Sequence, residues 1–183
     1  MKKIALLLLI FLTISKSFAQ DCNWLTTKDY ERGYRIDFPQ KPVVQSQEIA
    51  TEVGSLTMDM NMVDLSANST SDNMLYMVAY TAYPEGSDYD NEELQHSMLD
   101  GTVNGAVTNV NGKLISSKNI VLNGYNGRYA KISIYDDTII ISLKTILVNN
   151  ELYLLQIMTE TSKQSNENID KFLDSFDLIR IKN

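Results

Sequence analysis

The second half of the chain alternates apolar and polar residues in four consecutive runs. Successive side chains of a β-strand point to opposite faces of a sheet, so alternation with a period of two is typical of strands. Short polar turns separate the runs, which favours hairpins and therefore predicts an antiparallel meander. The four predicted strands span residues 113–122, 127–135, 138–148 and 151–159.

Two strands of this meander carry apolar residues along one face. Residues at every second position of a strand share a face of the sheet. The positions are Ile139, Ile141, Leu143 and Leu147 on the third strand, and Tyr153, Leu155 and Ile157 on the fourth. We expect both sets to build one core surface.

The rest of the chain supplies further strands and two amphipathic helices. Alternation predicts strands over residues 34–38, 43–51, 56–65 and 74–83, and a final strand over 177–181. Residues 24–30 are interpreted as an entry segment. Apolar residues at helical spacing predict helices over 90–107 and 165–176, with Asp90 and Ser165 as their N-caps.

The first predicted helix has an unusual composition. Glu93 lies three residues after Asp90, where it would complete a capping box. Gly101 and Gly105 each weaken the helix by about 1 kcal/mol relative to alanine. Because they are four residues apart, they lie on one side of the helix. We therefore expect them to let the helix backbone approach the sheet closely.

The N-terminal residues have the pattern of a secretory signal peptide. Two lysines precede a run of apolar residues, and small residues follow that run. We expect cleavage after Ala19, so that residues 1–19 are the signal peptide and 20–183 form a single domain. An uncleaved membrane anchor is the alternative, but the run is short for a bilayer. A lipid on Cys22 is disfavoured because Asp21 precedes it.

The charge balance of the chain limits its partners. The sequence has 23 acidic and 16 basic residues, a formal net charge of −7. Cleavage would remove three lysines and no acid, so 13 basic residues would face 23 acidic ones and the charge would become about −10. Nucleic acids require basic surfaces, so we expect no nucleic-acid partner. No other apolar run is long enough to cross a bilayer, so no stable membrane span is expected after cleavage.

His96 is the only histidine, and Asp100 follows it at position i+4. A histidine with an orienting carboxylate can serve as a general base in a hydrolase or a metal-dependent enzyme. The alternative is a solvated helix histidine, because its position predicts that it faces away from the apolar stripe. No nucleophile elbow, zinc-protease motif or P-loop occurs. We therefore assign no catalytic, cofactor-binding or metal-ligating residue.

Three other groups admit both a structural and a functional interpretation. Met58, Met60 and Met62 alternate along one predicted strand, which suits either core filling or a soft binding or metal site. Four acids at the start of the first helix either stabilise its dipole or bind calcium. These acids are Asp88, Asp90, Glu92 and Glu93. The single cysteine, Cys22, excludes an intramolecular disulfide and leaves pairing between chains open.

Four short segments resemble the PsbP-like and Mog-like superfamily. They are Tyr-Arg-Ile-Asp-Phe-Pro at 34–39, Leu-Asn-Gly-Tyr-Asn-Gly-Arg at 122–128, Glu-Leu-Tyr-Leu-Leu at 151–155 and Phe-Leu-Asp-Ser-Phe at 172–176. The resemblance implies an α+β fold in which an antiparallel sheet carries helices on both faces, an α/β/α sandwich. It supplies no catalytic residue, and its relatives range from an extrinsic photosystem subunit to a Ran-binding protein and periplasmic lipoproteins.

The leader and the resemblance together predict an exported protein, periplasmic or extracellular, that acts as a non-enzymatic accessory or binding domain. We expect its partner to be an envelope protein or a surface component. Such a domain needs a groove or an apolar patch without convergent titratable groups. One alternative is a small-ligand carrier, which needs a closed cavity between sheet and helices. The other is an enzyme that uses His96 with the nearby acids.

Overall fold

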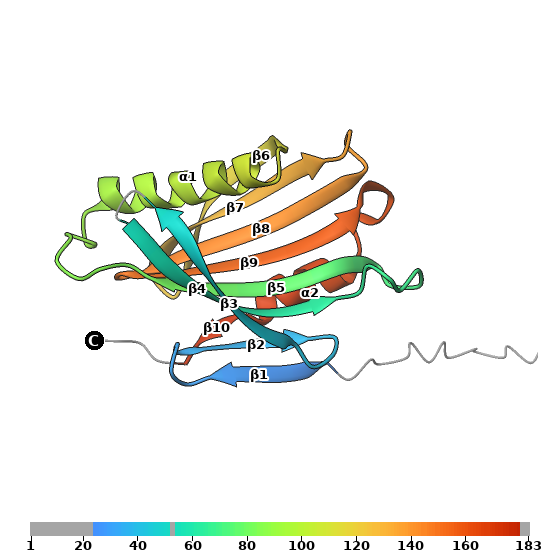
Figure 1. The fold of residues 1–183 in the computed structure, drawn as a ribbon, viewed down its shortest axis with the longest axis horizontal. Helices are drawn as coiled ribbons and strands as arrows, with labels where there is room; N and C mark the ends of the chain where they lie inside the picture. The colour runs from blue at the N-terminus through green and yellow to red at the C-terminus, as the bar shows by residue number, and fades with distance from the viewer. Residues whose placement is uncertain (1–23, 52–53, 180–183) are drawn as a thin grey trace, which may run out of the picture.

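The computed structural model describes residues 24–51 and 54–179, which fold into two antiparallel sheets and two α-helices (Figure 1). The larger sheet has seven strands in the order β3-β4-β5-β9-β8-β7-β6. They are β3 (Val43–Thr51), β4 (Gly54–Asp64), β5 (Asn73–Ala82), β6 (Lys113–Leu122), β7 (Tyr125–Ile134), β8 (Ile139–Val148) and β9 (Glu151–Glu160). The smaller sheet has the order β1-β2-β10, from β1 (Leu25–Asp29), β2 (Tyr34–Phe38) and β10 (Asp177–Leu178). The helices are α1 (Glu92–Asn109) and α2 (Glu167–Ser175), and a 3-10 turn (Thr161–Lys163) follows β9.

The predicted meander is confirmed, because β6, β7, β8 and β9 pair antiparallel in chain order. Asn123 and Gly124 have positive φ angles of 51° and 88°, the backbone that a two-residue hairpin requires. The prediction that the two apolar sets share one surface is wrong. Ser142 pairs with Ile157, so the odd-numbered positions of β8 and of β9 lie on opposite faces of the sheet.

One face of the large sheet is closed by α2 and the small sheet. α2 contacts β2, β5 and β9. The ring of Phe172 lies 5.3 Å from the rings of both Phe38 and Tyr76, measured between centroids. At the C-terminal end of α2, the Lys144 ammonium donates to the carbonyl oxygen of Leu173 at 2.9 Å, which satisfies a carbonyl that the helix itself cannot. This face holds the main core of the protein.

The described residues cover the opposite face only in part, because α1 is the one helix of theirs that packs on it. α1 packs on β7 and β8. Its buried Val103 contacts a cluster of apolar residues on these two strands, namely Ala130, Ile132, Ile134, Ile141 and Leu143. Figure 1 shows α1 lying along this side of the sheet, with β4 and β5 beyond it. The arrangement leaves part of the sheet face without a helix above it.

The predicted α+β fold, an α/β/α sandwich with helices covering both faces, is wrong, because one of the two outer layers is a second sheet packed together with α2. The part of the chain that the structure describes is mostly β, with 53% of those residues in strands and 19% helical. It contains two sheets and two helices among the described residues. The sequence analysis interprets residues 24–30 as an entry segment, but residues 25–29 form β1. β1 belongs to the small sheet, which lies with α2 on one face of the large sheet. Without β1, the sequence offers no neighbour for β2 in a second sheet, so the small sheet was not predicted.

The N-cap of each helix lies one residue later than the predicted cap, Asp90 or Ser165. The N-cap of α1 is Asn91, whose side-chain oxygen accepts from the backbone N–H of Leu94 at 3.0 Å. The N-cap of α2 is Asn166, which caps in the same way. Asparagine is as good an N-cap as aspartate or serine, so neighbouring candidates could not be separated from sequence. The expected capping box does not form, because Leu94 occupies its third position.

The predicted signal peptide, residues 1–19, and Cys22 lie outside the described residues. The predicted domain, residues 20–183, is therefore seen only in part. None of the helices that the structure describes is both long enough and apolar enough to cross a membrane.

Candidate functional site

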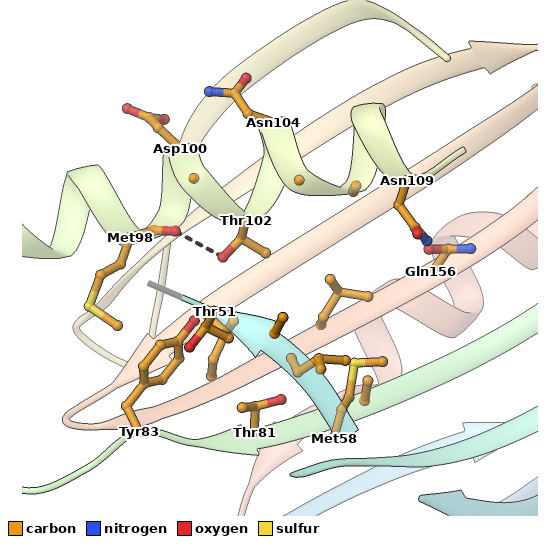
Figure 2. Close-up of a pocket in the computed structure, with 18 of the residues that line it drawn as sticks. Thr51, Met58, Thr81, Tyr83, Met98, Asp100, Thr102, Asn104, Asn109 and Gln156 are labelled. Atoms are coloured by element: carbon orange, nitrogen blue, oxygen red, sulfur yellow. Dashed lines mark hydrogen bonds between the residues drawn. The ribbon is translucent and has the colours of Figure 1, made fainter. Parts of the chain in front are cut away.

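A groove lies between α1 and the part of the large sheet that α1 leaves uncovered (Figure 2). Its volume is about 1240 Å³. β4, β5 and β9 form its floor, α1 forms one wall, and the end of β3 forms another. Small-molecule sites commonly have volumes of about 300–1000 Å³, so the groove has room for such a ligand. It is open to solvent and therefore differs from the closed cavity expected of a carrier.

The strand register arranges the floor of the groove in rows. Met58 pairs with Thr81, which pairs with Leu152; Met60 pairs with Ala79, which pairs with Leu154; and Met77 pairs with Gln156. Met60 is buried, whereas Met58 and Met77 are half-buried. The predicted methionine row therefore fills core at one position and lines a groove at another. Thioether side chains are flexible and polarisable, so such a floor can adapt to apolar ligands.

The wall formed by α1 is bare at two positions. Gly101 and Gly105 both line the groove, and a Cβ atom built on either would meet no atom within 4 Å. The expectation that these glycines let the helix approach the sheet closely is therefore wrong. Their missing side chains leave space in the groove instead. Leu94 and Met98 complete the apolar part of this wall.

Polar groups in the groove are mostly uncharged. Thr102 Oγ1 donates to the carbonyl oxygen of Met98 at 2.8 Å, which leaves the methyl group of the threonine to the groove (Figure 2). Burial raises the pKa of Tyr83, so this phenol stays neutral at physiological pH. Among the described residues of the lining, Glu48 and Asp100 are the charged ones. Hydrogen bonds from Thr57 and Ser55 hold the pKa of Glu48 below its usual value.

His96 does not line the groove. It is half-buried and lies 3.1 Å, at Nδ1, from Nη2 of Arg128. Arginine has no acceptor atom, so Nδ1 must accept and the proton of the neutral ring must be on Nε2. Arg128 is buried, and its Nε donates to Asp100 Oδ1 at 2.7 Å. The predicted pair of His96 and Asp100 is thus brought together by an arginine between them, which connects α1 to β7.

A second polar cluster connects the small sheet to the large one. The Arg32 guanidinium donates to Asp59 at 2.7 Å and to Asp29 at 3.1 Å. The hydroxyl of Tyr153 donates to the carbonyl oxygen of Arg32 at 2.6 Å. The hydroxyl of Tyr80 donates to Glu151 at 2.9 Å. These groups satisfy one another, which suits a structural connection between sheets better than a reactive site.

The acids at the start of α1 are not arranged as a metal site. Within residues 24–51 and 54–179, no group of three or more His, Cys, Asp or Glu side chains could hold a metal ion. Glu92 and Glu93 lie in the first turn of α1, where negative charge stabilises the helix dipole. Sequence reasoning missed the groove, because its residues come from seven separate elements and the loop before α1. The main sequence signal for the groove was the apolar stretch 74–83, which predicts a strand covered on both faces. One face of this strand, β5, lies in the floor of the groove.

Comparisons with known proteins identify the fold but no family. No protein-family model matches the chain, and no curated protein matches it significantly. The fold is similar to the solution structure of cyanobacterial PsbP (CyanoP) from Synechocystis sp. PCC 6803, with a TM-score of 0.53 and 15% sequence identity over 90% of this chain and 97% of that one. A weaker similarity, with a TM-score of 0.38 and 8% identity, links 80% of this chain to 90% of a Pseudomonas aeruginosa protein of unknown function. The first similarity supports the predicted PsbP-like fold; the Mog-like part of the prediction has no such support.

Proposed function

We propose that the protein is an exported, non-enzymatic accessory domain that binds a largely apolar small ligand in the groove between α1 and the large sheet. The proposal that it is exported rests on the signal-peptide pattern of its first residues. The observation that carries the binding function is the apolar floor beneath the bare wall at Gly101 and Gly105. Glycine inside an exposed helix costs about 1 kcal/mol relative to alanine, and here the missing side chains leave room for a ligand.

The lining of the groove favours binding over catalysis. Its charged groups, Glu48 and Asp100, are each engaged by neighbouring donors. A catalytic site needs a titratable group aimed at the reacting atoms. The nearby histidine accepts from Arg128 at Nδ1 instead of facing the groove. An apolar ligand with few polar groups would find dispersion contacts along the floor and hydroxyl groups at Thr81 and Thr51.

The test uses the neutral fluorescent probe N-phenyl-1-naphthylamine with the mature protein. We expect saturable binding to the wild type. The double variant Gly101→Leu with Gly105→Leu fills the groove and should weaken binding at least about tenfold. The matched control, Gly101→Ala with Gly105→Ala, adds only methyl groups and should keep most of the affinity. Circular dichroism verifies that each variant is folded.

Two results would contradict the proposal. One is an absence of saturable probe binding to the folded wild type. The other is equal affinity for the leucine and alanine variants, because the site of the probe would then lie away from α1.

A further inference from the structure

The large sheet ends in two edge strands, β3 and β6, and the two differ. An edge strand exposes unpaired N–H and C=O groups, and proteins commonly protect such edges with lysines, prolines or bulges. β6 has two of these features. It carries Lys113 and Lys118, and its register with β7 shifts between Leu114 and Ser116.

β3 has none of these features. Its nine residues pair with β4 in unbroken register, from Val43 opposite Met62 to Thr51 opposite Gly54. The strand contains no lysine and no proline, and its side chains at 43 and 44 are 60% and 73% exposed. Its single charged residue, Glu48, accepts hydrogen bonds from β4.

The outer backbone groups of β3 are available to another strand. Among the residues that the structure describes, β4 is the only element that shares backbone hydrogen bonds with β3. The occupant that satisfies a row of free backbone donors and acceptors is an extended polypeptide. The chemistry of this edge therefore calls for a β-strand and not for a helix or a small molecule.

We propose that β3 pairs antiparallel with β3 of a second copy of this chain, about a two-fold axis at Gln47. The side chains of β3 are self-complementary in this register. Val43 would lie opposite Thr51, Val44 opposite Ala50, Gln45 opposite Ile49 and Ser46 opposite Glu48. The exposed valine at 44 then meets an apolar residue, and no charge directly faces a like charge.

Neighbouring registers fit less well. A two-fold axis at Glu48 would place two carboxylates directly opposite each other, which is destabilising. An axis at Ser46 would place Val44 opposite Glu48. The axis at Gln47 avoids both pairs and joins two seven-stranded sheets into one.

The first test is a cross-link at the axis. A residue on the two-fold axis meets its own copy at a Cα separation of about 4.5–5.5 Å, within the range that a disulfide accepts. We expect the mature protein carrying Gln47→Cys in a Cys22→Ser background to form a covalent dimer on mild oxidation. The matched control, Lys118→Cys on the exposed edge β6 in the same background, should stay largely monomeric. Equal cross-linking of both variants would overturn the proposal.

The second test measures mass by light scattering from about 1 μM to about 500 μM protein. We expect a reversible dimer whose association strengthens with added salt, because each copy of the mature protein would carry a formal charge of about −10. Val44→Lys should weaken association at least about tenfold. Val121→Lys, at a β6 residue that is 68% exposed, should leave it unchanged.

Two outcomes of this measurement would overturn the proposal. If the wild-type protein stays monomeric over the whole concentration range, β3 does not pair with a second copy, and its partner strand would have to come from a different protein. A dimer that is equally weakened by both lysine variants would have formed through another surface.

Discussion

On one face of the large sheet, α2 and the small sheet bury a set of aromatic rings, whereas on the other face α1 covers β7 and β8 and leaves β4, β5 and β9 open. The rings of the closed face are Tyr34, Phe38, Tyr76, Tyr153, Phe172 and Phe176. The open face presents methionine, leucine, alanine and threonine instead. The same sheet therefore has a rigid, aromatic side and an adaptable, partly solvated side.

The difference has a physical cause in how the two sides are covered. Aromatic rings bury large areas and pack edge to face, as Tyr80 and Tyr153 do at a centroid distance of 5.5 Å. On the closed face, the small sheet and α2 together are wide enough to cover the central strands of the large sheet. One helix of 18 residues cannot cover seven strands, so part of that face is left as the floor of a groove. We infer that the closed face supplies most of the stability and that the open face supplies the binding site.

The largest expected effect separates the two faces directly. Phe172→Ala removes a fully buried ring from between Phe38 and Tyr76, so it should lower the free energy of unfolding by about 3–5 kcal/mol. Met58→Ala on the open face should cost about 1 kcal/mol, because its side chain is half-buried and already partly in water. Urea unfolding followed by circular dichroism measures both. Similar losses for the two variants would remove the distinction between the faces.

The second effect is a loss of stability at alkaline pH that comes from the closed face. Burial raises the pKa of Tyr34 from 10 to about 12. A raised folded-state pKa stabilises the protein below pH 10, and this contribution is lost as the pH rises from about 10 to about 12. Two pKa units correspond to about 2–3 kcal/mol. Burial also raises the pKa of Tyr80 and Tyr153, so these residues lose stabilisation over the same range above pH 10, and their loss continues to higher pH than that of Tyr34.

Tyr34→Phe isolates the contribution of this residue. Unfolding in urea between pH 8 and pH 12 should show a flatter decline in stability for Tyr34→Phe than for the wild type. Tyr135→Phe is the matched control, because Tyr135 is 75% exposed and its loss should leave the decline unchanged. A decline of the same steepness in all three proteins would show that Tyr34 is not the group that titrates.

The parts of the fold that could be predicted are those set by residues close together in the sequence. The meander followed from local alternation and turns, and the bounds of β6 agree with the prediction, residues 113–122. The small sheet was missed, because the pairing of β2 with β10 joins residues more than 130 positions apart. A two-residue strand such as β10 has no periodicity of its own. The mistaken core surface arose because alternation defines the faces of one strand but not the register between strands.

The candidate site was less predictable than the fold. The groove exists because a helix is narrower than the sheet beneath it, and no local pattern encodes that mismatch. The position of His96 was misjudged for a related reason. Spacing from Leu94 and Met98 suggested a solvated side chain, but Arg128 of β7 reaches back to it across the interface. An arginine on the same strand face as Ala130, Ile132 and Ile134 was the signal that could have pointed to a buried polar partner.

The third prediction concerns stability on the open face. Gly101→Ala and Gly105→Ala should each raise the free energy of unfolding by about 1 kcal/mol, because alanine favours helix and its methyl group meets no atom within 4 Å. Thermal and urea unfolding measure the change. Gly127→Ala on β7 is the contrasting variant, because its added Cβ would lie 2.4 Å from the carbonyl oxygen of Thr145 and should be destabilising. Destabilisation by the helix variants would mean that the wall of the groove is packed.

The smallest effect compares two buried threonines on opposite faces of the sheet. Thr145 lies on the open face beside Arg128, and its hydroxyl has no hydrogen-bond partner among the residues that the structure describes. Thr159 lies on the closed face, and its hydroxyl donates to the carbonyl oxygen of Asp72 at 2.9 Å. Both are fully buried. Valine has nearly the same shape as threonine, so each Thr→Val change tests the hydroxyl alone.

These two substitutions should have opposite signs. Thr145→Val removes a buried group that has lost its hydration without compensation, and it should raise the free energy of unfolding by up to about 1 kcal/mol. Thr159→Val leaves a buried carbonyl oxygen without its donor and should lower that free energy by about 1 kcal/mol. Urea unfolding of both variants in parallel gives the comparison. Equal destabilisation would mean that the hydroxyl of Thr145 has a partner in solution, which places water beneath α1 and extends the solvated region of the open face toward Arg128.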